Sequence, residues 1–449
     1  MAELAQRLAE ENAVPPPSFP EPKFSTAHVE SEVGVGYLIL SRSSGRRFFC
    51  PENSPYVETQ FSGSVSRCFE AWIDGQTWTD GGVRTDEIED EEPSFVDFGG
   101  QSYRFYQSRP LALKTCHIEE LKLEAQWQQR ELGELTGEDP VKEVAALQLL
   151  QSHPNVEELE EAMLDDTNIY KITTWYEGGE LFDLAPMPEE SAKAVFAELL
   201  DAVDFVHSRG VCHRDVSLEN VLMDTRIPER RGTCRSSSVS SIGSCVSIAS
   251  STFSETPSLA GGYCCSGDGN HDIPVPRKEI RSDYQPDAKG YIGRPRLCDF
   301  GMSLRIPKSA KGRKAPLTPQ GRCGKNTCVA PEVFYDEVFD GEAVDAWSLG
   351  TTLFMALLGV QPWEEVGDYK FQAIAEGKNL EVVLQGWKLR HLLTRDAVDL
   401  LQVRHGAEKP FPRIPRPSNR RLFFSRVVGT HGLVLLDRAQ VSSSLPSDR

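Results

Sequence analysis

The sequence lacks a run of apolar residues long enough to cross a bilayer, for which a helix needs about 20. Its most apolar late stretch, at 422–436, is interrupted by Arg426 and His431. The first 17 residues hold acidic side chains and no apolar core, so they do not resemble a secretory signal. These absences argue against membrane insertion, and we expect a cytoplasmic protein that contacts no membrane.

Positive charge and paired cysteines are scarce as well. The chain has 48 Lys and Arg residues against 67 Asp and Glu, a net charge of -19 at pH 7. Such an excess of negative charge is unfavourable for binding nucleic acid, so we expect no nucleic-acid partner. The 11 cysteines are scattered and show no paired CxxC sets of the kind that bind zinc, so we expect reduced thiols.

The residues best suited to catalysis lie in the stretch VCHRDVSLENVL at 211–222. Asp215 could accept the proton of an attacking hydroxyl, and Asn220, five residues later, offers a metal ion a neutral amide oxygen. Phosphoryl transfer that depends on Mg²⁺ suits this spacing. The alternative is a surface loop with chance charges, since His-Arg-Asp alone is common. The spaced asparagine and the strand-like NVLM that it begins make the combination much rarer.

This stretch resembles the catalytic loop of eukaryotic protein kinases of the serine/threonine type, in the divergent form HRDVSLEN. Further segments match the family in the family's order, namely LALK at 111–114, DFG at 299–301, APE at 330–332 and DAWSLG at 345–350. With insertions, the resemblance covers residues 56–402. It implies a two-lobed α+β fold, with a small, mainly β lobe, a larger, mainly α lobe and ATP in the cleft between them.

The chain divides around these motifs. Residues 1–32 hold five prolines among polar residues and are predicted to form a flexible lead-in. The small lobe is assigned to 33–176 with an acidic insertion, whose run DEIEDEE at 86–92 is expected to be a solvated loop. The large lobe is assigned to 177–402, and a basic, proline-containing tail follows at 403–449.

A Ser-rich segment at 227–293 separates the catalytic loop from the DFG motif and is predicted to be a disordered insert. Its serines could be phosphorylation sites, and an unremoved piece of gene sequence is an equal alternative. Near the other end, VGVGYLILSRSSGRRFF at 33–49 predicts two strands around a Ser-Gly turn. These strands either start the small lobe or belong to an extra layer.

Two stretches compete as the glycine-containing turn that would cover the phosphates. QFSGSVSRCFEA at 60–71 places Gly63 where the family has its middle glycine, and its FEA also resembles the family. The second stretch, at 95–105, has Gly99 and Gly100 and lies nearer to Lys114. We prefer the first. Either stretch lacks most of the family's glycines, and an ordinary hairpin turn is the alternative for both.

Lys114 ends a buried-strand pattern and needs a carboxylate partner to stay charged at low cost. Glu143, in the apolar-faced stretch VKEVAALQLL at 141–150, is best placed, and in the family this pair orients the lysine on the α- and β-phosphates. Glu138 is the runner-up, because Pro140 places it before the helix proper. An exposed helical glutamate is the alternative interpretation of Glu143.

The resemblance also assigns an adenine site. The stretch IYKITTWYEGGELFDL at 169–184 resembles the strand that runs into the hinge between the lobes. Thr173 would guard the back of the adenine pocket, and Tyr176 would offer backbone groups to adenine. Glu180 would meet ribose or a basic side chain of the substrate.

Ser217 is the main departure, since serine/threonine kinases have a phosphate-contacting lysine two residues after the catalytic aspartate. Where the family has Gly-Thr before its APE motif, this chain has Gly324-Lys325. The hydroxyl and the amine have traded places. We hypothesise that Lys325 reaches beside Asp215 and supplies the charge that Ser217 cannot. A solvent-facing loop lysine is the alternative.

The resemblance implies a protein serine/threonine kinase that uses ATP and Mg²⁺ on a protein substrate. Asn220 and Asp299 would hold the metal, and Asp215 would position and deprotonate the acceptor hydroxyl. Arg214 would pair with a phosphate on Thr318, added by a regulatory kinase. The alternative is a pseudokinase that acts as a nucleotide-binding or scaffolding regulator, and a third possibility is a chain that does not fold.

Overall fold

The computed structural model describes residues 22–402, except 30–33, 43, 53, 55, 60–62, 76–91, 124–138, 226–291, 309–312 and 377–378. The predicted Ser-rich insert and acidic loop lie outside the described residues apart from residues 92, 292 and 293, and the predicted tail lies wholly outside them. One expectation is corrected, because residues 22–29 of the supposed flexible lead-in form a strand that pairs on both sides.

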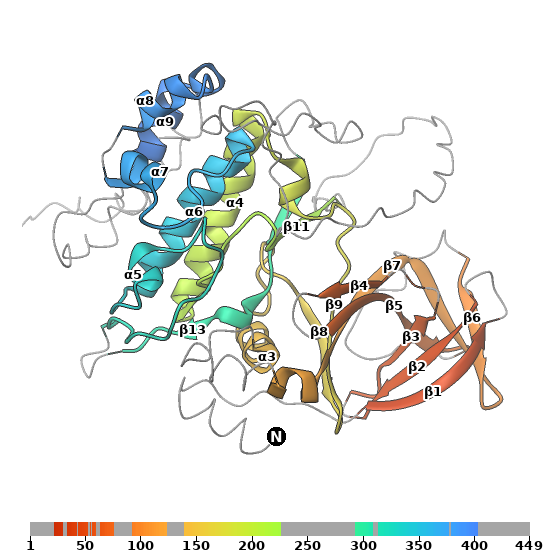
Figure 1. Ribbon diagram of the computed structural model, residues 1–449. Helices are drawn as coiled ribbons and strands as arrows, with labels where there is room; N and C mark the ends of the chain where they lie inside the picture. The colour runs from red at the N-terminus through yellow and green to blue at the C-terminus, as the bar shows by residue number, and fades with distance from the viewer. Residues whose placement is uncertain are drawn as a thin grey trace, which may run out of the picture.

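A nine-stranded sheet dominates the small lobe, with the order β4-β5-β3-β2-β1-β6-β7-β9-β8. Its strands are β1 (Pro22–Val29), β2 (Val35–Ser41), β3 (Arg47–Pro51), β4 (Tyr56–Thr59), β5 (Gly63–Ile73), β6 (Ser94–Phe98), β7 (Gln101–His117), β8 (Leu159–Leu164) and β9 (Asn168–Thr174). Because β5 also pairs with β7, the strands β5-β3-β2-β1-β6-β7 close into a ring (Figure 1).

Strand β7 belongs both to this ring and to the rest of the sheet. Its first residues pair with β6, and its last residues, which include Lys114, pair with β9. The register against β5 shifts between Phe69 and Ala71, so Phe69 faces Pro110 while Ala71 faces Phe105. Proline has no backbone N–H to donate, and a break in the ladder is where a strand tolerates it.

Strands β2 and β3 alternate their side chains between two apolar clusters. Leu38 and Phe49 pack with Phe69 and Phe105 in a cluster supplied by strands of the ring. Their chain neighbours Ile39 and Phe48 pack on the opposite side, with residues of β7, β8 and β9. The two predicted strands and their Ser-Gly turn are therefore confirmed. They belong to the closed ring, which is the extra layer, rather than to the catalytic sheet, the strands β5, β7, β9 and β8 around Lys114.

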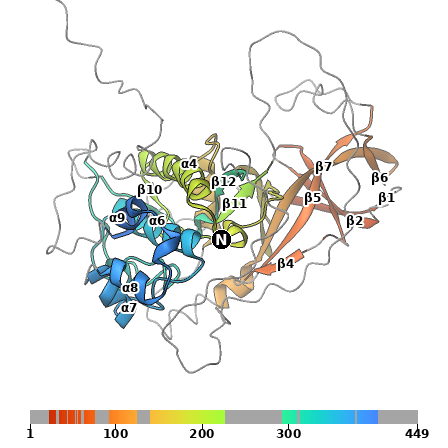
Figure 2. The ribbon, with the colours of Figure 1, turned by 90° about the horizontal axis from the view of Figure 1, so that it is seen from above.

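The large lobe is built on two long helices, α4 (Glu189–Ser208) and α6 (Gly341–Leu358) (Figures 1 and 2). The apolar face of α4, including Val195, Leu199 and Val206, is buried. Shorter elements complete the lobe: η2 (Leu181–Leu184), η3 (Phe300–Met302), α5 (Pro331–Phe334), α7 (Tyr369–Phe371), η4 (Gln372–Glu376), α8 (Leu380–Gly386), η5 (Arg390–Leu392) and α9 (Arg395–Gln402). Among the described helices, none is long and apolar enough to span a bilayer.

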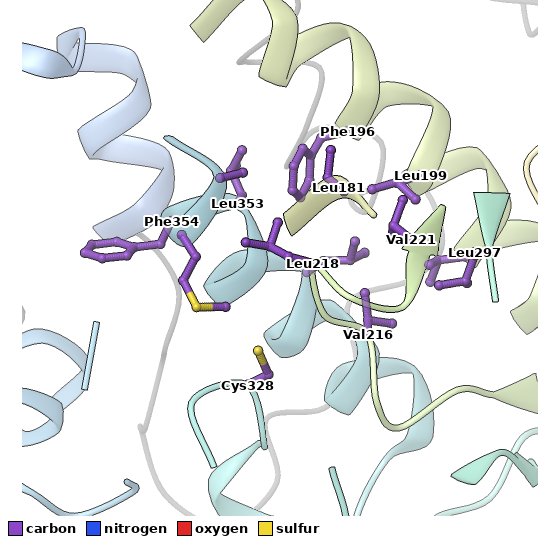
Figure 3. Close-up of a cluster of buried hydrophobic side chains, with 14 of the residues drawn as sticks. Leu181, Phe196, Leu199, Val216, Leu218, Val221, Leu297, Cys328, Leu353 and Phe354 are labelled. Carbon is purple, nitrogen blue, oxygen red and sulfur yellow. The ribbon is translucent and has the colours of Figure 1, made fainter. Parts of the chain in front are cut away.

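Two short strand pairs position the candidate catalytic residues. Strands β11 (Val221–Asp224) and β12 (Arg294–Leu297) are antiparallel neighbours, so the chain on either side of the long insert returns to one place. Strands β10 (Val211–Cys212) and β13 (Leu304–Arg305) form the second pair. Val216 and Leu218, between β10 and β11, and Val221, at the start of β11, point into the apolar core beside α4 and α6, which fixes the ends of the catalytic loop (Figure 3).

Candidate active site

The backbone of the catalytic loop is held by one buried carboxylate. Asp345 on α6 accepts hydrogen bonds from the His213 N–H at 2.8 Å and the Arg214 N–H at 2.7 Å. The His207 ring lies 2.7 Å from the same carboxylate. Burial alone would raise the pKa of Asp345, but the hydrogen bond and charge of His207 hold that pKa below its ordinary value. An ionised Asp345 therefore fixes the loop that carries Asp215.

Asp215 is almost fully buried, and its carboxylate is oriented from two directions. The Asn220 side-chain amide donates to the Asp215 backbone carbonyl at 2.8 Å and to Asp215 Oδ2 at 2.7 Å. The Lys325 backbone N–H donates to Asp215 Oδ1 at 3.1 Å. Because the Asn220 nitrogen is used in this way, its amide oxygen remains the group that can bind a metal.

Lys325 lies where the hypothesis from the sequence put it. Its Nζ is 3.0 Å from Ser217 Oγ and 3.4 Å from Asp215 Oδ2. Burial alone would lower the pKa of this ammonium group, but the Asp215 and Glu219 carboxylates raise it above the ordinary lysine value. The structure therefore places a positive charge beside Asp215, in contrast to the alternative of a solvent-facing loop lysine.

Gly324 allows this approach. Its φ of +82° is in the left-handed region, and a Cβ added there would lie 2.9 Å from the Arg214 carbonyl oxygen and 3.2 Å from Asp215 Oδ1. A side chain at this position would push the two segments apart. The Gly-Lys pair thus works as a unit, because the glycine permits the contact that the lysine makes.

The DFG motif lies next to the catalytic loop, although the long insert separates them in sequence. The Cys298 N–H donates to the Asn220 carbonyl at 3.0 Å, and His213 Nε2 donates to the Cys298 carbonyl at 3.0 Å. The Phe300 ring also packs edge-on against the His213 ring, with their centroids 4.7 Å apart. The residues on both sides of Asp299 are therefore fixed to the catalytic loop.

Asp299 itself is held in the ionised form that a metal requires. It has a left-handed φ of 59° and accepts a hydrogen bond from the Gly301 N–H at 3.3 Å. Burial alone would raise its pKa, but the positive charges of Lys114 and Lys171 lower the pKa below the ordinary value.

Asn220 and Asp299 together suit a hard cation. An amide oxygen and an ionised carboxylate are donors that Mg²⁺ prefers, and Mg²⁺ usually keeps waters and substrate phosphates as its other ligands. Within the described ranges, no group of three or more His, Cys, Asp or Glu side chains could hold a metal ion by itself. The two residues therefore fit a site that the substrate would complete.

Lys114 and Glu143 meet, as the sequence analysis expected. Lys114 Nζ lies 3.1 Å from Glu143 Oε2 on helix α3 (Pro140–Leu149). The helix begins at Pro140, with Asp139 as its N-cap, and Glu143 is buried rather than exposed. The runner-up Glu138 lies outside the described residues.

Gly63 begins β5 directly after the β4–β5 turn, whose central residues 60–62 lie outside the described residues. It faces Cys116 on β7, two residues from Lys114. The rival glycines, Gly99 and Gly100, form the two-residue connection between β6 and β7 at the other end of the Lys114 strand. Gly63 is therefore the glycine nearer to Lys114, whereas Gly99 and Gly100 form a two-residue hairpin turn, and the choice of Gly63 as the phosphate-covering glycine stays a prediction.

The residues that the sequence assigns to the hinge lie around the end of β9. Thr173 is buried and faces Ala112 on β7. The Tyr176 ring is used for packing, with the Arg296 guanidinium 5.4 Å from its centroid, so only the backbone of Tyr176 is suited to adenine. Burial, together with the nearby charges of Asp183 and Glu219, raises the pKa of Glu180 to about 7.

Arg214 and Thr318 are not brought together. The Arg214 side chain is buried, its Nε donates to the Met302 carbonyl at 2.7 Å, and its Nη1 has no hydrogen-bond partner among the described residues. Thr318 is exposed, and its hydroxyl accepts a hydrogen bond from the Gln320 amide at 3.2 Å. The expected contact between Arg214 and a phosphate on Thr318 thus stays a prediction.

Sequence reasoning missed two buried charged residues, Lys171 and Glu157, which join Glu143 in one ion-pair network. The available signal was the lysine within the apolar pattern IYKITT at 169–174, where a charge needs a partner. It also missed Glu219, whose Oε2 is buried without a hydrogen-bond partner in the part of the chain that the structure describes.

Comparison with known proteins agrees with this geometry. Similar proteins include CBL-interacting serine/threonine-protein kinase 16 of Arabidopsis thaliana, 30% identical over 229 residues, which are 49% of this chain and 34% of that protein. CBL-interacting protein kinase 3 of Oryza sativa subsp. japonica is 29% identical over 228 residues, 50% of this chain and 35% of that protein. The chain thus matches about a third of the length of these relatives.

The family described as protein kinase domain matches residues 104–230 and 287–403, which is more than half of the chain. The matched segments contain Lys114, Glu143, Asp215, Asn220 and Asp299, whereas Gly63 and most of the closed ring of strands precede them. The two-lobed α+β fold and the order of the motifs agree with that match. The chain belongs to the protein kinase family.

Proposed function

We propose that this chain is an active serine/threonine kinase, which transfers the γ-phosphoryl group of ATP to a hydroxyl of a protein substrate. One observation carries the proposal: Lys325 Nζ lies 3.0 Å from Ser217 Oγ and 3.4 Å from Asp215 Oδ2. The positive charge that the family takes from the catalytic loop is thereby available from the segment before the APE motif. Charge fixed beside the reacting groups is a major source of catalysis in phosphoryl transfer.

Asp215 accepts the proton of the attacking hydroxyl, and its orientation by Asn220 and Lys325 supports this role. Lys114, paired with Glu143, holds the α- and β-phosphates. Asn220 and Asp299 hold Mg²⁺, which neutralises phosphate charge when it is bound.

The remaining nucleotide contacts follow from the positions of three residues. Gly63 begins β5 directly after the β4–β5 turn, beside the Lys114 strand, and would lie over the phosphates. Thr173 closes the back of the adenine pocket, and the backbone at Tyr176 supplies hydrogen bonds to adenine. Gly63 is the only glycine in the stretch 60–71, so we expect weaker nucleotide binding than in a kinase with the full glycine motif.

The substrate is a protein with basic side chains near a serine or threonine. Glu219 is close enough to help raise the pKa of Glu180, and Glu219 Oε2 is buried without a hydrogen-bond partner among the described residues. Two such carboxylates favour a cationic side chain. The name of the Arabidopsis relative also specifies a serine/threonine kinase, and the catalytic loop lacks the arginine-containing pattern of tyrosine kinases.

We also propose that Thr318 is phosphorylated by a regulatory kinase. Its side chain is exposed, and Arg214 Nη1 has no hydrogen-bond partner among the described residues. A phosphate that reached this guanidinium would form charge-assisted hydrogen bonds.

The test is transfer of labelled phosphate from Mg·ATP to a basic serine peptide by the purified full chain, beside Asp299→Asn. We expect activity in the wild type and its loss in the variant, with both proteins giving cooperative thermal unfolding. A folded wild type without activity would contradict the proposal, and a thermal shift with Mg·ATP would then identify a nucleotide-binding pseudokinase.

A further inference from the structure

Lys171 is a second lysine beside the one that the family uses. It lies on β9 directly opposite Lys114 on β7, and residues opposite each other on antiparallel strands share a face of the sheet. The Lys171 side chain is only 8% exposed, compared with 16% for Lys114. Lysines are seldom buried to this degree without a specific partner.

Glu143 is shared between the two lysines. Its Oε2 lies 3.1 Å from Lys114 Nζ, and its Oε1 lies 2.5 Å from Lys171 Nζ. Lys171 Nζ is also 3.0 Å from Glu157 Oε2, and both carboxylates are almost fully buried. Two lysines and two glutamates thus form a buried network whose formal charges balance.

The network joins helix α3 to the sheet at two points, one on β7 and one on β9. Glu143 belongs to α3, whereas Lys114 and Lys171 belong to adjacent strands. Glu157 is itself fixed, because its backbone N–H donates to the Leu297 carbonyl at 2.9 Å. Although burial alone would lower the pKa of Lys171, Glu143 and Glu157 raise it above the ordinary lysine value, so the amine stays charged.

We propose that Lys171 is a positioning residue that holds Glu143, and with it helix α3, against the sheet independently of Lys114. Lys114 then meets a carboxylate that is already in place, and a bound nucleotide is not needed to bring α3 inward. This inference rests on the proposed kinase function for its kinetic consequence, but its structural consequence can be measured without any activity.

The competing explanation is that Lys171 only neutralises Glu157 in the core. The double variant Lys171→Met/Glu157→Gln separates the two, because it removes one charge of each sign and leaves the Lys114–Glu143 pair. Glu157→Gln alone is the matched control, since it leaves Lys171 free to bind Glu143. Lys171→Arg keeps the charge and the ability to donate to both carboxylates.

The experiment measures hydrogen exchange of the α3 amides, residues 141–149, in the full chain, together with kcat and the KM for Mg·ATP. For the double variant we expect α3 exchange to rise at least about tenfold and the KM to rise about tenfold, with kcat changed by less than about threefold. Glu157→Gln and Lys171→Arg should stay close to wild type in α3 exchange.

Lys114→Met supplies a second test that does not depend on the folding of the double variant. We expect it to lose kinase activity while α3 keeps its protection from exchange. Loss of α3 protection in Lys114→Met, or unchanged α3 exchange in a folded double variant, would overturn the proposal whatever the kinetics. A wild type without kinase activity would instead refute the proposed function and leave the exchange result to decide this inference.

Discussion

Lys325 and Ser217 are hydrogen-bonded across the catalytic site, with Lys325 Nζ 3.0 Å from Ser217 Oγ. The contact joins the segment before the APE motif to the catalytic loop, and its two chemical groups stand in the reverse order to the lysine and threonine of the family. The arrangement keeps one ammonium and one hydroxyl beside Asp215. The position of the charge, rather than the segment that carries it, is therefore the feature to test.

Lys325→Met should lower kcat by about 10²–10³-fold, because it removes a fixed charge beside the reacting groups. The KM for ATP should change little, since Lys114 and the proposed metal-binding residues are untouched. Steady-state phosphorylation of a basic serine peptide measures both constants. Lys308→Met, which alters an exposed lysine earlier in the same segment, is the control and should behave as wild type. Full activity in Lys325→Met would refute the role of this lysine.

The exchange of lysine and hydroxyl between positions 217 and 325 also predicts that a second substitution restores part of the kcat lost without Lys325. Ser217→Lys/Lys325→Thr restores the family's arrangement, so its kcat should exceed that of Lys325→Met by at least about tenfold. Ser217→Lys alone would crowd two ammonium groups beside Asp215 and should be less active than the double variant. If the double variant were no better than Lys325→Met, the two positions would not be equivalent sources of the charge.

The residues proposed for phosphoryl transfer could be predicted from the sequence, because they lie in short motifs at set spacings. Asp215, Asn220 and Asp299 lie in short motifs, and the exchange at Ser217 and Lys325 was visible because each residue sits at a fixed offset from a motif. The buried partners of Lys171 could not be predicted in this way. They come from a helix and a separate loop, and their meeting depends on packing between elements rather than on any local pattern.

The ring of strands was also beyond sequence reasoning. Local alternation identified β2 and β3, but ring closure depends on the pairing of β1 with β6, where His28 pairs with Asp97 in the register. The proline-rich composition before β1 favoured a flexible segment, and the pairing of distant strands overrode that preference. The ring shares β5 and β7 with the catalytic sheet, so packing within it bears on the strand that carries Lys114.

The pKa of Glu180, raised to about 7, predicts that recognition of a basic peptide depends on pH. Above this pKa the carboxylate is charged and attracts the peptide, whereas below it the neutral acid does not. The KM for the peptide should therefore rise as the pH falls from 8 to 6, while the KM for ATP changes less. Glu180→Gln should abolish this part of the dependence, and an unchanged pH profile in that variant would show that Glu180 is not responsible.

The raised pKa of Glu180 also affects stability, in the direction opposite to peptide binding: stability should fall as the pH rises. Because the folded-state pKa lies above the ordinary value of 4.5, folding favours the protonated form of Glu180. Its contribution to the free energy of unfolding is present below pH 4.5 and is lost as the pH rises through about 7. Denaturant melts of wild type and Glu180→Gln at pH 5 and pH 8 should show a smaller fall in stability for the variant. Equal falls would contradict the assignment.

Phe105 should be essential to the ring of strands. It is fully buried, and its ring centroid lies 5.2 Å from that of Phe49 and 5.3 Å from that of Phe69. Phe105→Ala should lower the free energy of unfolding by about 3–5 kcal/mol, because it removes a large apolar side chain and leaves a cavity. Phe98→Ala, at a partly exposed position on β6, is the matched control and should change it by less than about 0.5 kcal/mol.

Denaturant melts followed by circular dichroism measure both variants. If the ring and the catalytic sheet unfold as one unit, Phe105→Ala will shift a single transition, because β5 and β7 run through both. A separate early transition that leaves ATP-induced stabilisation intact would show instead that the ring opens on its own. A stability loss no larger than that of Phe98→Ala would contradict the packing of Phe105 altogether, since a fully buried aromatic side chain cannot be removed without cost from a core that it fills.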